Sequence, residues 1–328
     1  MARSRGRATR VFFAADLHGS EPTFRKFVNA AAFYGCEALV FGGDLMGKVL
    51  VPIVGAGGRY RARFQGRDHE LGPDELAAFT RSVELPGFYW RVMEPDEYRE
   101  TKADPLRQKA LFQDLATERL ERWIAFAEDR VAGTGVRMYL SGGNDDEPAV
   151  LGALERHRGE HVVPCEGRVA ELDGVHAMIT VGLSTVTPWD TPREASEREI
   201  AAAIETEVQK LPDPSRAVFN LHCPPKGTPI DTCLQLAPPS EPGELPTPVR
   251  EGGRFVTTSG GSRAVREALE RHQPVVGLHG HIHESMGRFR IGRTQCFNPG
   301  SEYVQGVLQG VIVTLRGGEL VGYQHTSG

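Results

Sequence analysis

The chain has 328 residues, enough for one large domain or two small ones. A chain of this length buries roughly three quarters of its unfolded surface, so it needs no disulfide or structural metal to fold. Its formal net charge of -5 argues against a dedicated nucleic-acid or membrane-surface domain, because such domains are usually basic.

Targeting signals are weak along the whole chain. No apolar stretch approaches the ~20 residues needed to span a bilayer. The Arg-rich start, residues 1–10, has no apolar segment behind it, so we expect a solvated tail rather than a secretory signal.

The sequence contains five cysteines, an odd number, and they are scattered without any C-x-x-C motif: Cys36, Cys165, Cys223, Cys233 and Cys296. This pattern predicts reduced thiols and a cytoplasmic protein.

The first elements form a strand–helix–strand unit. Residues 10–19 and 37–45 are short apolar runs that end in Asp and Gly, as buried parallel strands tend to. Between them, Phe24, Phe27 and Val28 follow the spacing of one helix face. An α/β fold with a parallel sheet is therefore expected from the start of the chain.

The segment 46–105 breaks this rhythm, with a Gly-rich stretch followed by an aromatic one, before a long helix predicted over 106–131. An irregular segment of that length inside a compact domain is usually functional or mobile. We interpret it as a cap or lid over the strand ends, and the alternative is a surface insertion without a chemical role. Arg59, Arg61 and Arg63 alternate within it, and they either reach a substrate phosphate or line a solvated strand face.

Further strands follow in the second half of the chain. The apolar runs are 137–140, 176–183, 217–222 and 274–280. The tail, 306–325, predicts a β-hairpin that turns at Gly317 and Gly318.

Two helices are expected among these strands. The first spans 193–210, with Thr191 as its N-cap and Pro192 in its first turn. The second spans 263–272, with Ser262 as its cap.

Metal-binding types of side chain follow five of the predicted strands. They are Asp16, His18, Asp44, Asn144, His222, His281 and His283. In an open α/β sheet, ligands bind beyond the carboxyl ends of the strands, where all of these residues lie. Residues two apart in a strand point the same way, so Asp16 and His18 can share a target, as can His281 and His283. The set predicts a metal site.

The ligand types restrict the metal. Imidazole with carboxylate and without thiolate suits Mn, Fe, Zn or Ni, and disfavours Cu(I) or an iron–sulfur cluster. Cys223 follows His222 directly, but adjacent strand residues face opposite ways, so we expect this thiol to pack in the core.

The ordered set D-x-H, G-D, G-N-x-[DE], H and G-H-x-H resembles the signature of the calcineurin-like metallophosphoesterases. The match runs from Asp16 to His283 and extends to FNPGSEY at 297–303. The stretches HCPPKGTPID and TPWDTPRE are similar to the Icc-related prokaryotic branch. The resemblance implies a four-layer α/β/β/α sandwich, with 1–328 as a single domain and the cap insertion at about 46–105.

The resemblance also implies a dinuclear centre. It assigns Asp16, His18 and His283 to one metal, Asn144, His222 and His281 to the other, and Asp44 to both. Two such ions can grip a phosphoryl group and lower the pKa of a shared water, so that hydroxide attacks phosphorus in line. Two divalent ions, less two carboxylates and one hydroxide, leave a charge of roughly +1, which favours an anionic substrate.

One position departs from the family pattern. Most relatives have His after the Asn of this motif, and this chain has Asp145. Three interpretations stay open. Asp145 points into the site as a carboxylate and disfavours dianionic monoesters, or it is protonated and serves as the acid, or it caps the helix that starts near Pro148. Asp146 is the stronger cap candidate, because Pro148 follows it closely.

The functional prediction is a metal-dependent phosphoesterase acting on a small-molecule phosphoester. A phosphodiester is favoured. Without the His acid, hydrolysis slows least for an ester whose leaving group needs little protonation, such as a phenolate. A non-catalytic metal-binding scaffold of the same fold is the first alternative. A nuclease is the second, although the acidic balance argues against long nucleic acids. Trp189 either walls the pocket, stacking on a base or aryl group, or is a structural aromatic.

Overall fold

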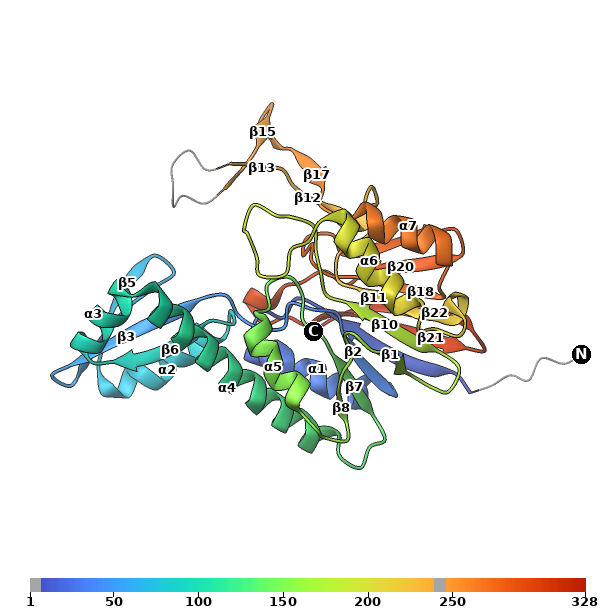
Figure 1. The fold of residues 1–328 in the computed structure, drawn as a ribbon. Coiled ribbons are helices and arrows are strands. Elements are labelled where there is room, and N and C mark those ends of the chain that lie inside the picture. The colour runs from blue at the N-terminus through green and yellow to red at the C-terminus, as the bar shows by residue number, and fades with distance from the viewer. Residues whose placement is uncertain (1–6, 239–245) are drawn as a thin grey trace, which may run out of the picture.

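Two six-stranded sheets form the centre of the protein in the computed structural model, which describes residues 7–238 and 246–328 (Figure 1). The first sheet has the order β22 (Glu319–Ser327), β21 (Gln309–Arg316), β1 (Thr9–Ala14), β2 (Ala38–Phe41), β7 (Arg137–Leu140) and β8 (Val162–Pro164). The second has the order β19 (Gly287–Ile291), β20 (Thr294–Asn298), β18 (Val276–Leu278), β11 (Val218–Leu221), β10 (Ala177–Val181) and β9 (Ala170–Glu171).

The central strands of each sheet are parallel. In the first sheet β1, β2, β7 and β8 run the same way, and in the second sheet β10, β11, β18 and β20 do so. The carboxyl ends of β1, β2 and β7 therefore lie at one edge of their sheet, and those of β11 and β18 share an edge of theirs. The predicted metal-binding side chains follow these five strands.

The apolar side chains divide into layers. In β1, Phe12 packs against the helices α1 (Glu21–Tyr34), α4 (Pro105–Val131) and α5 (Pro148–Arg156), and Phe13 packs between the two sheets. Side chains such as Phe219 on the far face of the second sheet pack against α6 (Glu197–Val208) and α7 (Arg263–His272). Strands buried on both faces explain the continuous apolar runs. The fold is a four-layer α/β/β/α sandwich, as the sequence predicted.

Most local predictions are confirmed. The hydroxyl of Ser262 accepts a hydrogen bond from the Val265 N–H and caps α7. The β21–β22 hairpin turns at Gly317 and Gly318, with φ of 59° and 85°, a conformation that glycine adopts without strain.

The predicted start of the helix over 193–210 is wrong. Helix α6 begins at Glu197, where Ser196 and Glu199 form a capping box that satisfies backbone donors reciprocally. Thr191, predicted as the cap, lies in the preceding loop instead.

The segment 46–105 is regular rather than irregular. Strands β3 (Leu50–Ala56), β4 (Arg59–Phe64), β5 (Arg67–Leu71) and β6 (Tyr89–Met93) form a sheet in the order β5-β4-β3-β6, followed by α3 (Pro95–Ala103). Helix α2 (Pro73–Glu84) covers it, and Ile53, Phe64, Phe79 and Val83 belong to a separate core. The strands were missed because turns at Gly57–Gly58 and Gln65–Gly66 cut them short. In Figure 1 this small sheet extends sideways from the sandwich.

A narrow arm extends from the second sheet (Figure 1). It contains the two-stranded pairs β12 (Thr232–Leu234) with β17 (Thr257–Ser259), β13 (Leu236–Ala237) with β14 (Thr247–Pro248), and β15 (Arg250–Glu251) with β16 (Arg254–Phe255). Short 3-10 helices span Pro214–Arg216, Pro229–Asp231 and Tyr303–Gln305.

The cysteines and the helices also bear on the sequence predictions. All five cysteines are free thiols, and Cys223 is buried, as predicted. Across residues 7–238 and 246–328, no helix combines the length and the apolar character that a membrane span requires. The first six residues of the predicted Arg-rich tail lie outside the described part.

Candidate metal centre

The strand-end loops bring the seven predicted side chains together in two groups. The potential ligand atoms of Asp16, His18 and His283 all lie within 4.8 Å of one another. Those of Asp44, His222 and His281 do the same. This is the division that the family resemblance implies, with Asn144 beside the second group.

Four of these residues adopt a left-handed backbone, which non-glycine residues rarely do. The φ angles are 58° at Asp16, 43° at His18, 56° at Asp44 and 69° at His281. Such strain persists where the surrounding structure enforces it, and it clusters at functional sites. Here the backbone N–H groups of Asp16 and His18 donate to the carbonyl oxygens of Gly43 and Asp44, at 2.9 and 3.0 Å. Asp16 and His18 therefore point toward the same site because the loop turns there, and not because they alternate along a strand as predicted.

Asp44 lies between the two groups. Its Oδ1 is 3.5 Å from His222 Nε2, and its Oδ2 is 3.7 Å from His18 Nε2. Each carboxylate oxygen thus faces one imidazole of a different group. The Asn144 Oδ1 lies 3.0 Å from the same His222 nitrogen. A carboxylate in this position can bind two cations at once.

Each imidazole turns a ring nitrogen toward the site. The Nδ1 of His222 lies 2.8 Å from the Gly42 carbonyl oxygen, which can only accept, so Nδ1 carries a proton and Nε2 is the nitrogen that faces the site. The Nε2 atoms of His18 and His283 face each other at 2.9 Å. At this distance one ring can donate to the other, according to its tautomer, and a cation bound between them would take both Nε2 lone pairs. Buried donors aimed inward and an all-nitrogen-and-oxygen ligand set fit divalent first-row metals.

The charges of these groups depend on burial and on Asp44. Burial lowers the pKa of His281 to about 4, so this ring is neutral and can act as a ligand. Burial also acts to lower the pKa of His222, but the Asp44 carboxylate outweighs it and raises that pKa to about 9. Asp44 itself has a pKa well below its usual range, because attraction to His222 and His18 outweighs its own burial.

Asp145 points into the site and does not cap a helix. Its side chain is 8% exposed and forms an ion pair with Lys48. Its Oδ2 lies 3.6 Å from His18 Nδ1, and its backbone N–H donates to Asp44 Oδ1 at 2.9 Å. Burial and the Asp44 charge raise the pKa of Asp145 to about 7, against the opposing effect of Lys48.

Asp146 does not cap α5 either, so that prediction is wrong. The N-cap residue of α5 is Glu147, which makes no side-chain cap hydrogen bond. The Asp146 carboxylate instead accepts from the backbone N–H groups of Leu45, Met46 and Gly143, at 2.9, 2.8 and 2.8 Å. These donors come from the loops after β2 and β7, so Asp146 joins the two loops that carry Asp44 and Asn144.

Sequence reasoning missed Lys48 and Tyr303. Lys48 reaches Asp145 across the site, and nothing in its local sequence indicates this, because the contact depends on where the insertion leaves the sheet. The Tyr303 ring centroid lies 4.7 Å from that of His18 and 5.8 Å from that of His283. Tyr303 ends the FNPGSEY stretch, so the family motif was a signal for it.

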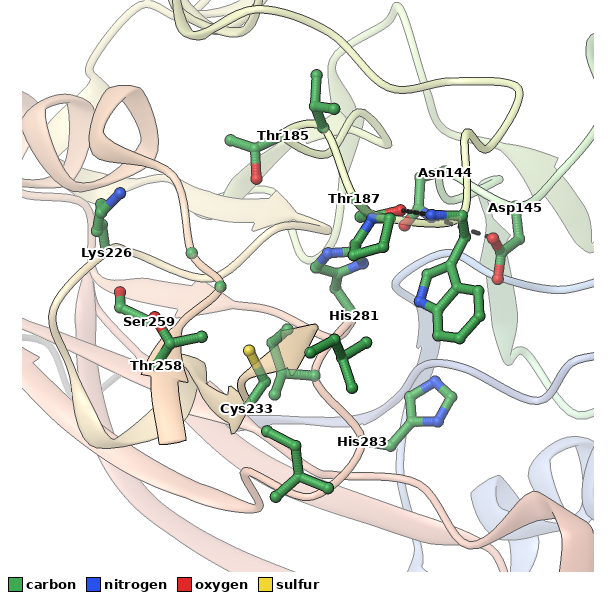
Figure 2. A pocket seen from close by; sticks show the side chains of 18 of the residues that line it. Asn144, Asp145, Thr185, Thr187, Lys226, Cys233, Thr258, Ser259, His281 and His283 are labelled. Carbon is green, nitrogen blue, oxygen red and sulfur yellow. Dashed lines mark hydrogen bonds between the residues drawn. The ribbon is translucent and has the colours of Figure 1, made fainter. Parts of the chain in front are cut away.

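A cavity of about 750 Å³ opens from these side chains (Figure 2). Asp44, Asn144, His281 and His283 line one part, and the rest lies between the 185–189 segment and the hairpin arm. Among the described residues of 46–105, Lys48 alone lines it. The arginines of β4 lie exposed on their own sheet, with Arg61 paired to Glu70, as the solvated-face interpretation expects.

No protein-family model and no curated protein matches the chain. One solved crystal structure matches 98% of this chain and 99% of its own, at 16% identity and a TM-score of 0.55. A sulfate thiohydrolase, SoxB of Thermus thermophilus, in complex with glycerol, matches 97% of this chain and 56% of its own, at 14% identity and a TM-score of 0.36. A predicted phosphoesterase from Streptococcus pneumoniae TIGR4 matches 98% and 99%, at 10% identity and a TM-score of 0.28. Of these three, the first has a TM-score above 0.5, and it shows the fold alone.

Proposed function

We propose that the protein is a metal-dependent phosphoesterase of the calcineurin-like superfamily, nearest in its motifs to the Icc-related branch. The observation that carries the proposal is the convergence of seven buried or half-buried donors in two groups that share Asp44. A small-molecule substrate and a cytoplasmic location are predictions that rest on the sequence.

The chain's own residues fit two divalent ions of Mn, Fe, Zn or Ni. Asp16, His18 and His283 would hold one ion, Asn144, His222 and His281 the other, and Asp44 both. Bound there, the ions supply Lewis-acid activation of a phosphoester and of water. The hydrogen bond of His222 to Gly42 and the anchoring of the loops by Asp146 keep the donors oriented before any ligand arrives.

Charge supports a phosphodiester substrate. The Lys48–Asp145 pair adds no net charge, so the two ions, the two carboxylate ligands and one hydroxide leave roughly +1. A monoanionic diester matches this charge, whereas a dianionic monoester exceeds it. Lys48 also lines the cavity, so its ammonium would donate to a phosphoryl oxygen bound there.

We also propose one domain over 1–328, with a cap insertion at about 46–105 that acts on the site through Lys48. A non-catalytic metal-binding scaffold is the second candidate. It is favoured by one observation, the carboxylate of Asp145 where relatives have an imidazole acid.

The test is hydrolysis of bis-(p-nitrophenyl) phosphate and p-nitrophenyl phosphate by Mn²⁺-loaded protein, with Asp44→Asn as the blank. Turnover of the diester that disappears in Asp44→Asn supports the enzyme. Metal analysis of the same samples should find about two ions per chain in the unmodified protein. Two bound ions with no turnover of either ester under Mn, Fe, Zn or Ni would favour the scaffold.

A further inference from the structure

The loop between β10 and α6 carries two exposed apolar side chains at the edge of the cavity. Val186 is 76% exposed and Trp189 is 52% exposed, and both line the cavity that contains Asn144 and His281. Single exposed apolar residues are ordinary, but two on one loop beside a candidate active site indicate a binding surface.

Hydrogen bonds within this loop fix the backbone at Trp189. The Ala195 N–H donates to the Ser184 carbonyl oxygen at 2.9 Å and closes the base of the loop. Inside it, Glu194 accepts from the Thr191 N–H and from the hydroxyl of Thr187. The Trp189 N–H donates to that same Thr187 hydroxyl at 3.2 Å. Because this backbone is already ordered, a ligand that binds Trp189 does not have to order the loop.

The same loop is attached to the metal centre. The Asn144 side-chain amide donates to the Thr191 hydroxyl at 2.9 Å, which in turn donates to Glu194 at 2.9 Å. The Arg193 N–H donates to the Asn144 carbonyl oxygen at 3.0 Å. The backbone that carries Trp189 therefore has a defined position relative to the donors, and the Asn144 amide is oriented with its oxygen toward His222.

Apolar side chains also line the opposite side of the cavity. Leu234 and Leu236 of the arm and Ile282, between His281 and His283, all contribute to the lining. Figure 2 shows Cys233 and Lys226 on this side, away from Asn144 and Asp145. The cavity volume of about 750 Å³ far exceeds what a phosphoryl group fills.

We infer that the part of the cavity between Trp189 and the arm binds a flat apolar group of the substrate, so that the ester carries an aryl or heteroaryl substituent. The phosphoryl group lies at the donors, and the ring stacks on the Trp189 indole. The inference rests on the proposed function, because it takes the phosphoryl group to bind beside Asp44 and Asn144.

Binding of hydrolysis-resistant, monoanionic phosphinates tests this without turnover. Calorimetry on Mn²⁺-loaded protein should show methyl(phenyl)phosphinate binding roughly tenfold tighter than dimethylphosphinate. Trp189→Ala should remove most of that preference, and Trp189→Phe should keep most of it, because phenylalanine also stacks. Phe33→Ala is the matched control, since Phe33 is an aromatic residue of α1 that is 81% exposed and does not line the cavity. Circular dichroism establishes that each variant is folded.

The outcomes separate this inference from the proposed function. An equal preference in Trp189→Ala and the unmodified protein, or no preference in the unmodified protein, would overturn the aryl site. Hydrolysis of nitrophenyl esters without a Trp189-dependent preference would overturn the aryl site alone. Binding of methyl(phenyl)phosphinate that depends on Trp189, with no hydrolysis of any ester, would support the aryl site and count against the enzyme.

Discussion

Lys48 and Asp145 form an ion pair that joins the start of the insertion to the loop carrying Asn144. The pair lies at the edge of the cavity, with the Asp145 side chain 8% exposed and the Lys48 side chain 44% exposed. Removing either partner leaves the other charge beside Asp44. Substitutions of Lys48 and of Asp145 should therefore both change the activity, but in different ways.

Replacing Lys48 by Ala should lower kcat/KM for bis-(p-nitrophenyl) phosphate by about 10²-fold, because a cation that donates to the phosphoryl group is lost. Lys48→Arg keeps the charge and should retain most of the activity. Steady-state kinetics on the Mn²⁺-loaded proteins measures both. If Lys48→Ala is as active as the unmodified protein, Lys48 does not contact the substrate.

Replacing Asp145 by Asn distinguishes the two interpretations of this residue that remain. If Asp145 is a carboxylate that reduces the charge of the site, Asn leaves Lys48 uncompensated and dianionic substrates gain. The ratio of kcat/KM for p-nitrophenyl phosphate to that for the diester should then rise by roughly tenfold. If Asp145 is the acid, both values should fall by ~10²-fold or more, and most for poor leaving groups.

Metal removal should destabilise the fold. The buried Asp44 carboxylate lies between the His18 and His222 imidazoles, and divalent cations bound there would balance its charge and join the loops that carry these ligands. Dialysis against a chelator should lower Tm, and Mn²⁺ at a hundred times its Kd should restore about 2.7 kcal/mol. For a chain of this size that corresponds to roughly 4 °C. Asp44→Asn should show a much smaller shift in calorimetry, and an equal shift would place the metal elsewhere.

Gly87 should tolerate no side chain. Its φ is +84°, and a Cβ there would lie 1.8 Å from the carbonyl oxygen of His18. Gly87→Ala should therefore push on the loop that carries His18 and cost about 3–5 kcal/mol. Gly133→Ala is the matched control, because its φ is +72° with nothing within 4 Å of the added atom, so backbone strain alone applies. Urea unfolding of both variants compares them, and equal losses would contradict the steric explanation.

Glu128 predicts a specific pH dependence of stability. Burial acts to raise its pKa, but hydrogen bonds with His157 and from the backbone N–H groups of Val162 and His161 outweigh it, so the folded pKa is lowered. A carboxyl whose pKa is lowered in the folded state stabilises the fold at pH values above its unfolded pKa of 4.5. This stabilisation is lost as the pH falls through the pKa of the folded state. Glu128→Gln should cost about 1 kcal/mol at pH 7 and progressively less below pH 4.5. A loss that does not change with pH would indicate that packing, not charge, is responsible.

Local patterns were sufficient for the parts of the fold that depend on local chemistry. The run at 137–140 is β7, and Ser262 caps α7, because apolar runs and capping hydroxyls act over a few residues. For the segment 46–105 these local patterns gave the wrong prediction, an irregular segment instead of a sheet with helices. Its strands are short and partly exposed, so their alternation was weak, and the core that Ile53 and Phe79 form connects segments that are not adjacent in the chain.

By itself, the amino-acid sequence determined which residues could bind metal, because Asp16, His18, Asp44 and the others each follow an apolar run that ends at a sheet edge. Only the tertiary structure decided how they meet. It put the two oxygens of Asp44 toward different imidazoles and paired Lys48 with Asp145. Contacts of this kind join loops that are far apart in the chain, and their distances depend on how two sheets and an insertion pack together.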